Sequence, residues 1–479
     1  MRREAPSLRA FGRPRFPRAP VRGGPYFPRL FMAIIKPFAA LRPRPELAAR
    51  LCELPYDVMS SDEARALATG NPLSFLHVSK PEIDLPPGTD LYAPEVYAKG
   101  KENFVRLIAE GALRRDAEPR FYYYRQIMGR HQQTGLVAAA SCADYLAGVI
   151  KKHELTRPDK EDDRVRHIET LNAQTGPAFL TYRAVPALDE LAVRVTAGTP
   201  EVDFTAADGV RHIAWTVMEA ADTARIVAEF ARIPGLYIAD GHHRSAAAGR
   251  IFQQRRGENP ANQSAPCASE PRPRSADLQS GAVATRAGGA AGSEVGDPVW
   301  GKGGSSVFLA VIFPHNQMQI LPYHRVLKDL NGLTTEALLT RLASVFEFLP
   351  AGAPQPGQAH HLSLYLAGGW HALAFRAEFT RSENPIERLD VSLLQRLVLA
   401  PVFGIDDPRT SQRIGFVGGI RGSGELKKLV DRGDYACAFA LHATGIEDLM
   451  AIADAGGIMP PKSTWFEPKL RDGMFCHLI

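Results

Sequence analysis

The stretch YIADGHHRSAAAGRI, residues 237–251, joins an apolar run that ends in an acid to an alanine-rich run through a single glycine. The apolar run predicts a buried strand over residues 235–240, because aromatic and β-branched residues are typical of strands. The alanine-rich run predicts a helix from about residue 244, and Gly241 permits the tight turn between the two. The sequence therefore predicts a strand, a turn and a helix, with two histidines and an arginine at the start of the helix.

The start of a helix attracts anions, and this gives the charged turn a chemical interpretation. Free backbone N–H groups and the positive end of the helix dipole point to the same place, and histidine and arginine side chains add donors suited to phosphate. An acid at the end of the strand can orient a histidine or hold a metal bound to phosphate oxygens. The predicted phosphate- or nucleotide-binding residues are Asp240, Gly241, His242, His243 and Arg244.

Two other interpretations of this turn stay open. It can be a strand–turn–helix corner whose histidines and arginine are solvated or paired. It can also bind zinc through the two histidines, although adjacent histidines rarely bind one ion and neither an HExxH motif nor a cysteine set completes such a site.

A second charged stretch, KKHELTRPDKEDDRVRHIETL at residues 151–171, predicts a short strand followed by a helix from about Asp159. His153 and Glu154 are the predicted catalytic pair, because a carboxylate beside a histidine can serve as a general base. The cations Lys152, Arg157 and Arg164 can approach an anionic substrate. The alternative is a solvated helix crossed by salt bridges and without catalytic function.

Three further segments carry polar residues that we interpret as lining the same cleft, with an ordinary turn or surface role as the alternative for each. The segments are LPYDVMS (54–60), which contains Tyr56 and Asp57, LPYHRVLKDLNG (321–332) and MPPKSTWFEPKL (459–470). The candidates for this additional cleft are Lys152, Arg164, His324, Arg325, Lys462, Ser463 and Thr464.

The chain of 479 residues is longer than a single hydrophobic core usually supports, so more than one domain is expected. We expect a disordered Arg/Pro-rich tail over residues 1–31, with Met32 as a candidate physiological start, and a disordered insertion of low complexity over 257–305. Between them lies an α/β region, 32–256, and a C-terminal α/β region, 306–479, is expected to complete the site.

Strand-like and helix-like runs alternate without a regular βαβ order, so the predicted class is mixed α/β, or α+β. Residues 119–128 and 133–142 predict a pair of strands, and residues 306–313 predict a buried strand. Residues 95–113 and 335–349 carry apolar residues at helical spacing and predict amphipathic helices.

Charge and motif content exclude several classes of protein. Residues 1–31 hold eight arginines and one acid, so most of the net charge of +5 lies in this tail, and no basic helix-turn-helix supports nucleic-acid binding. No apolar stretch is long enough to span a membrane and no signal peptide is visible, so a cytoplasmic protein is expected. The five cysteines lack metal-ligand spacing, and the P-loop, GxGxxG and GxSxG motifs are absent.

The charged segments named above, taken in chain order with ADGHHR, resemble the bacterial domain of unknown function 1015 family over essentially residues 32–479 apart from the insertion. More distantly, the strand–DGHHR–helix unit resembles the ParB/sulfiredoxin superfamily, in which this turn binds nucleotide phosphates. Free-serine kinases of that superfamily carry a His-Glu pair upstream of the turn, with the glutamate as catalytic base. The resemblance implies a ParB/sulfiredoxin-like nucleotide-binding core, Glu154 as base, and ATP or ADP with Mg²⁺.

These observations predict a small-molecule phosphotransferase, a nucleotide-dependent kinase acting on free L-serine or a similar hydroxyl metabolite. The alternatives are a ParB-like regulator that binds a nucleotide, and a metal-dependent hydrolase that uses the histidines. The expected partners are a nucleotide and a small substrate, without nucleic acid or membrane.

Overall fold

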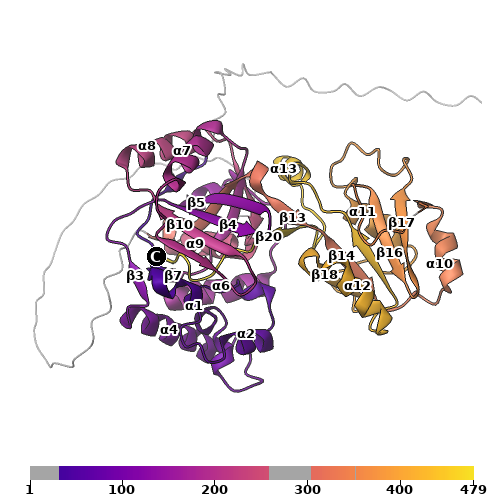
Figure 1. Cartoon of the computed structure of the whole chain (residues 1–479), viewed down its shortest axis with the longest axis horizontal. Helices are drawn as coiled ribbons and strands as arrows, with labels where there is room; N and C mark the ends of the chain where they lie inside the picture. Colours follow the sequence, from indigo (N-terminus) through magenta and orange to yellow (C-terminus); the bar gives the residue numbers. More distant parts are fainter. Residues whose placement is uncertain (1–31, 258–303, 351) are drawn as a thin grey trace, which may run out of the picture.

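The computed structural model describes residues 32–257, 304–350 and 352–479. The predicted tail, 1–31, and all of the predicted insertion except Gly257 and residues 304 and 305 lie outside the described residues. The described chain forms two lobes that lie side by side (Figure 1). Each lobe contains a β-sheet covered by helices, so the mixed α/β class predicted from the sequence is confirmed.

A nine-stranded mixed sheet forms the centre of the first lobe. In spatial order its strands are β6 (Ile150–Lys151), β11 (Leu236–Asp240), β8 (Ala178–Tyr182), β12 (Val307–Pro314), β5 (His131–Ser141), β4 (Tyr122–Met128), β10 (Arg211–Thr216) and β9 (Val202–Thr205), with β1 (Ile35–Lys36) also paired to β5. Strands β11 and β6 are parallel, as are β12 and β8, and the other pairs are antiparallel. The predicted pairing of residues 119–128 with 133–142 is confirmed by the β4–β5 hairpin.

The position of β12 separates the lobes differently from the sequence-based division at residues 305 and 306. All eight residues of β12 are buried, and the strand pairs with β5 on one side and β8 on the other. A strand of this composition needs ladder partners on both edges, and the first lobe supplies them. The first lobe therefore includes residues 307–314 as well as residues 32–257.

Helices on the first lobe place the site-forming segments. Helix α9 (His242–Arg255) packs against α5 (Cys142–Leu146) and α6 (Pro158–Leu171), and α6 packs in turn against α4 (Pro94–Ala109). Further elements of this lobe are α1 (Ala48–Leu51), α2 (Ser61–Ala68), α3 (Leu76–Ser79), α7 (Pro186–Thr196), α8 (Ala220–Phe230), and the paired strands β2 (Leu41–Pro43) and β3 (Leu113–Arg115).

The second lobe contains a six-stranded antiparallel sheet. Its strands in spatial order are β15 (Phe346–Phe348), β17 (Gly369–Phe375), β16 (His361–Leu366), β19 (Cys437–Leu441), β14 (Tyr323–Leu327) and β18 (Ile414–Gly418). Its helices are α10 (Thr335–Leu342), α11 (Asp390–Leu394) with the π-helical continuation Gln395–Leu399, α12 (Gly422–Asp431) and α13 (Ile446–Asp454). The helix predicted over 335–349 is thus shorter, because residues 346–348 pair with β17 instead.

The last residues of the chain return from the second lobe to the first. Strand β20 (Trp465–Glu467) pairs with β13 (Gln319–Leu321) between the lobes (Figure 1), and β21 (His477–Leu478) pairs with β7 (Ala173–Gln174). Residues 471–479 are all buried. This return brings polar residues of the C-terminal segment to the turn after β11. In the part of the chain that the structure describes, no helix is long and apolar enough to span a bilayer.

Candidate functional site

The strand–turn–helix unit predicted around Gly241 is confirmed. Strand β11 ends at Asp240, Gly241 has a φ of 86°, and α9 begins at His242. This left-handed conformation favours glycine, and a Cβ atom at this position would also lie only 3.3 Å from the Cα of Ala178. The Gly241 N–H donates to Asp240 Oδ1 over 2.7 Å, so the acid fixes the turn.

Asp240 forms an ion pair with a lysine of the segment 459–470 that is not among the predicted site residues, and the lysine side chain is buried whereas that of Asp240 is 38% exposed. Its Oδ2 lies 2.7 Å from Nζ of Lys469, which follows β20. Burial disfavours the charged carboxylate, but Lys469 and the nearby Arg244 outweigh burial and hold the pKa of Asp240 far below its usual range. Asp240 is therefore a permanent anion whose oxygens are both engaged, and its role is to orient the turn.

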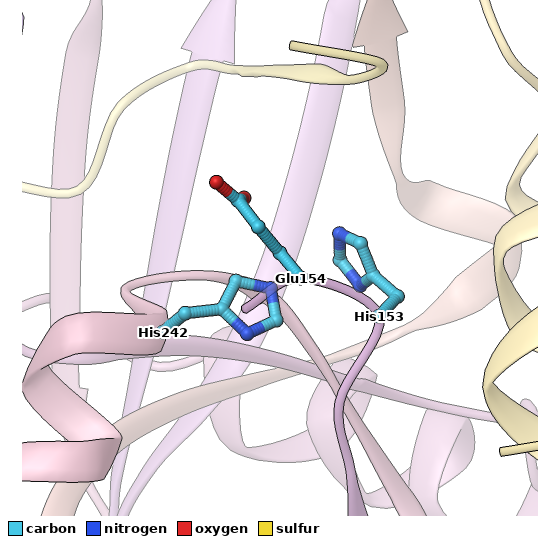
Figure 2. A group of neighbouring side chains, drawn as sticks. All are labelled: His153, Glu154 and His242. Atoms are coloured by element: carbon cyan, nitrogen blue, oxygen red, sulfur yellow. The ribbon is translucent and has the colours of Figure 1, made fainter. Parts of the chain in front are cut away.

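The predicted His-Glu pair lies beside this turn. Strand β6 ends at Lys151 and runs parallel to β11, so the residues that follow it reach the same edge of the sheet as Gly241. The ring centroids of His153 and His242 lie 4.5 Å apart at an interplanar angle of 86°. Ligand atoms of His153, Glu154 and His242 all lie within 4.8 Å of one another (Figure 2). The fold thus unites two motifs that are far apart in the sequence.

Both imidazoles of this cluster are buried with a nitrogen that has no partner among the described residues. His153 is 2% exposed and its Nδ1 is unpaired, while His242 is 6% exposed and its Nε2 is unpaired. Desolvation lowers the pKa of His153 to about 4 and that of His242 well below its ordinary value. Both rings are therefore neutral near pH 7. Buried polar atoms without partners are costly, which points to a ligand at this place.

Glu154 differs from the two histidines because its side chain is exposed. In Figure 2 its carboxylate extends away from the backbone that it shares with His153. Desolvation by the surrounding protein raises the pKa of Glu154, Lys462 opposes this effect, and the negative charges of Asp240 and Asp57 reinforce it. A carboxylate with a raised pKa that solvent can reach is suited to accept a proton from a bound hydroxyl group.

Two predicted cations flank the cluster. Lys462 is exposed and acts electrostatically on Glu154, and Lys152 is exposed, lies 4.0 Å from the ring of Tyr145 and acts on His242. The loop that carries Lys462 is held at the site, because the Met459 N–H donates to the His153 carbonyl over 2.8 Å. The two cations suited to phosphate therefore come from segments that lie far apart in the sequence.

The other predicted residues have local partners. His243 Nε2 accepts a hydrogen bond from the Arg157 N–H over 3.1 Å, and Ser463 Oγ donates to the Pro460 carbonyl over 2.6 Å. Thr464 is half-buried in the same loop.

His324 and Arg325, predicted from the sequence to line the additional cleft, lie within β14 of the second lobe. His324 Nδ1 accepts from the Leu441 N–H, and Arg325 donates to the Lys462 carbonyl over 3.0 Å. Their hydrogen bonds within the described residues do not reach the turn after β11. Both side chains are buried because β14 lies inside the second sheet. Arg325 holds the loop of Lys462 through its hydrogen bond to the Lys462 carbonyl.

A pocket lies next to the turn, and the guanidinium groups of Arg164 and Arg244 line it. Arg244 donates to the Pro177 carbonyl over 2.9 Å and to Asp57 over 3.3 Å. The remaining lining residues are Tyr56, Ser79, His167, Ile168, Gln174, Thr175, Gly176, Phe308, Leu309 and Asp472. Of these residues, Tyr56, His167 and Ile168 lie in segments that the sequence patterns indicate for the site, and the others, Asp472 among them, do not. The available signal for Asp472 is the charged tetrapeptide KLRD, residues 469–472, whose last two residues belong to the buried C-terminal run.

The model of a family described as "Protein of unknown function (DUF1015)" matches residues 35–275 and 280–392. No curated protein matches the chain. Among solved structures, a free serine kinase in complex with AMP is 12% identical, with a TM-score of 0.31 and coverage of 69% of this chain and 86% of that chain. SbnI with a C-terminal truncation, from Staphylococcus aureus, is 9% identical, with a TM-score of 0.34 and coverage of 70% and 85%. A conserved hypothetical protein from Pyrococcus furiosus is 13% identical, with a TM-score of 0.30 and coverage of 72% and 95%.

Proposed function

We propose that this chain, which belongs to the DUF1015 family of proteins of unknown function, is a nucleotide-dependent phosphotransferase for a small hydroxylated metabolite. One observation carries the proposal: the Glu154 carboxylate lies within 4.8 Å of a ring nitrogen of His242 at the start of α9. A candidate base thus stands beside a candidate phosphate site. The proposal rests on these residues rather than on the likeness to solved structures.

The start of α9 supplies the phosphate site. In an α-helix the first backbone N–H groups have no partner inside the helix, and α9 has 14 residues, so its dipole adds a positive potential at this end. Lys152 and Lys462 add two cations from outside the helix. Asp240 does not repel the phosphates strongly, because Lys469 neutralises it. This arrangement is suited to the terminal phosphates of ATP or ADP.

Phosphoryl transfer to an alcohol also needs a divalent cation and a base. Asp57, an exposed carboxylate 3.3 Å from Arg244, would hold Mg²⁺ through the oxygen ligands that this ion prefers, and the ion would supply charge neutralisation at the phosphates. Glu154 accepts the proton of the acceptor hydroxyl group. Neutral His153 packs edge-on against His242 and so fixes the position of that ring. Free L-serine is the proposed acceptor on the basis of the motif resemblance.

A second candidate function is a metal-dependent hydrolase, and the arrangement of His153, Glu154 and His242 favours it. Two neutral imidazoles and a carboxylate are a ligand set that Zn²⁺, Fe²⁺ or Mn²⁺ accepts, with open positions for water. The zinc site considered from the sequence used the adjacent histidines, whereas the structure groups His242 with His153. His243 is instead bonded to the Arg157 N–H. In this alternative Glu154 is a ligand and not a base.

The test is an incubation of the purified full chain with ATP or ADP, Mg²⁺ and a panel of free amino acids. We expect a phosphorylated hydroxy amino acid, detected by phosphorus NMR or mass spectrometry. A matched experiment measures metal content after dialysis against Zn²⁺ or Mn²⁺. The hydrolase would be favoured over the kinase if the wild type binds a stoichiometric metal ion that His153→Ala does not bind, and if the wild type forms no phosphorylated product.

A further inference from the structure

We propose that the pocket between α6, the start of α9 and the C-terminal segment binds the zwitterionic end of a free amino acid, with its carboxylate at Arg164 and Arg244 and its ammonium group at Asp472. This deepens the proposed function, because it assigns the acceptor class to a place next to the phosphate turn. The ligand class follows from the unused donors and acceptors in the pocket walls.

The acceptor wall is Asp472. Its side chain is 2% exposed, one carboxylate oxygen receives the Tyr56 backbone N–H, and Oδ1 has no partner among the described residues. Ser79, on the same pocket, is 3% exposed, and its Oγ is also unpartnered. Burial of an unpartnered carboxylate oxygen is costly, so this oxygen is expected to meet a strong donor in the functional state.

The donor wall consists of two guanidinium groups that flank the Tyr56 ring, at 3.8 Å for Arg164 and 5.4 Å for Arg244. Arg164 gives Nε and Nη2 to Asp163, and Arg244 gives Nη1 and Nη2 to the Pro177 carbonyl and Asp57. Nη1 of Arg164 and Nε of Arg244 make no hydrogen bond within the described part of the chain. These donors are suited to a carboxylate.

A simple anion or a simple cation would fit only half of this pocket. An anion would satisfy the guanidinium groups but would be repelled by Asp472. A cation would be attracted by Asp472 but repelled by the guanidinium groups. A molecule that carries both charges on one carbon satisfies both walls. Gly176 keeps the space open between them, because a Cβ atom there would lie 2.5 Å from Asp472 Oδ1. The α-amino acid zwitterion is the smallest metabolite class with this pattern.

The position of Arg244 connects this pocket to the chemistry. Arg244 belongs to the first turn of α9, two residues after His242. An amino acid held by its zwitterionic end therefore lies beside the phosphate turn, and its side chain is the part left to reach Glu154. A hydroxyl-bearing side chain is then the group that accepts the phosphoryl group.

The test is isothermal titration of the full chain at pH 7.5, without nucleotide, with L-serine, ethanolamine and 3-hydroxypropionate. Ethanolamine lacks the carboxylate and 3-hydroxypropionate lacks the ammonium group, and we expect each to bind at least tenfold more weakly than L-serine. Glycine and L-alanine keep the zwitterion and are expected to bind. Equal affinity for L-serine and either analogue, or no binding of any amino acid to folded protein, would overturn the proposal.

Two variants test the assigned atoms. Asp472→Asn is expected to weaken L-serine binding by at least tenfold, and Ser79→Ala by about threefold, with Asp144→Asn as a control at a buried carboxylate outside the pocket. Thermal melting checks that each variant is folded. Binding of L-serine without turnover supports the pocket and contradicts the kinase. Turnover whose KM is unchanged in both pocket variants contradicts the pocket and leaves the kinase standing.

Discussion

Asp472→Asn is expected to raise the thermal stability of the protein at neutral pH, although the residue it replaces is buried. Burial raises the pKa of Asp472 from 3.8 to about 6, and Arg244 and Arg164 offset burial only in part. The carboxylate therefore costs free energy in the folded state wherever it is ionised. A functional group held at such a cost is typical of binding sites.

The magnitude follows from this shift. A rise of about two pKa units corresponds to about 3 kcal/mol, since one unit is worth ~1.4 kcal/mol. The asparagine amide places a polar atom where Oδ1 had no hydrogen-bond partner, and burying this atom reduces the gain in stability by roughly 1 kcal/mol. The net gain is about 1–2 kcal/mol, or an increase of roughly 2–8 °C in the melting temperature at ~2–4 °C per kcal/mol.

The pH dependence of stability gives an independent check on the sign of the effect of Asp472→Asn. Well below pH 3.8 Asp472 is protonated in both the folded and the unfolded state, so its pKa shift contributes nothing to stability. Between pH 4 and about 6 the unfolded state loses the proton first, and the wild type is progressively destabilised. The advantage of Asp472→Asn should therefore be small at pH 4 and close to its full value at pH 7.5.

Differential scanning calorimetry of the wild type and Asp472→Asn at pH 4 and 7.5 measures both quantities. Asp163→Asn is the matched control with the opposite expected sign, because Asp163 accepts hydrogen bonds from Tyr97 and Arg164. A lower melting temperature for Asp472→Asn at pH 7.5, as expected for Asp163→Asn, would show that Asp472 is a structural ion-pair partner. The inference of an unpartnered acceptor in the pocket would then fail.

Three further predictions concern the turn and the sheet. Lys462→Ala should weaken ATP or ADP binding about tenfold in a titration, with the exposed Lys328→Ala unchanged, because one charge-assisted contact to phosphate is lost; equal affinities would remove Lys462 from the site. Lys469→Met should lower the melting temperature more than Asp240→Asn combined with Lys469→Met does, because the single variant leaves the half-buried Asp240 carboxylate without its partner. An equal loss in the single and the double variant would contradict the role given to this ion pair. Gly135→Ala should lower the free energy of unfolding of the first lobe by about 1–3 kcal/mol in chemical denaturation, because its Cβ would lie 2.7 Å from Val311 Cγ1. An unchanged free energy of unfolding would show that β12 shifts to accommodate the added methyl group.

Local patterns predicted the elements around the site well. The apolar run before Asp240, the glycine and the alanine-rich run form β11, the turn and α9. The runs at residues 119–128 and 133–142 likewise form the predicted pair of strands, β4 and β5. These features depend on residues close in the chain, where backbone preference and burial act together.

Features that depend on distant contacts could not be predicted in this way. The apolar residues within 346–348 continue the helical spacing of the preceding segment, but residues 346–348 pair with β17 at the edge of the second sheet and form β15. Lys469 and Asp472 reach the turn only because the chain end returns to the first lobe, and no local pattern encodes that return. His324 and Arg325 carry site-like chemistry, yet β14 places them in the core of the second lobe.

The most direct test of the central claim is the kinetic comparison of the wild type with Glu154→Gln. If Glu154 is the base beside the phosphate turn, phosphoryl transfer to the amino acid should fall by ~10²-fold or more, while nucleotide affinity and metal content stay unchanged. The glutamine keeps the size and hydrogen-bonding capacity of the side chain and removes only its basicity. Near-normal turnover in Glu154→Gln, or loss of a bound transition metal together with activity, would contradict the assignment of Glu154 as the catalytic base.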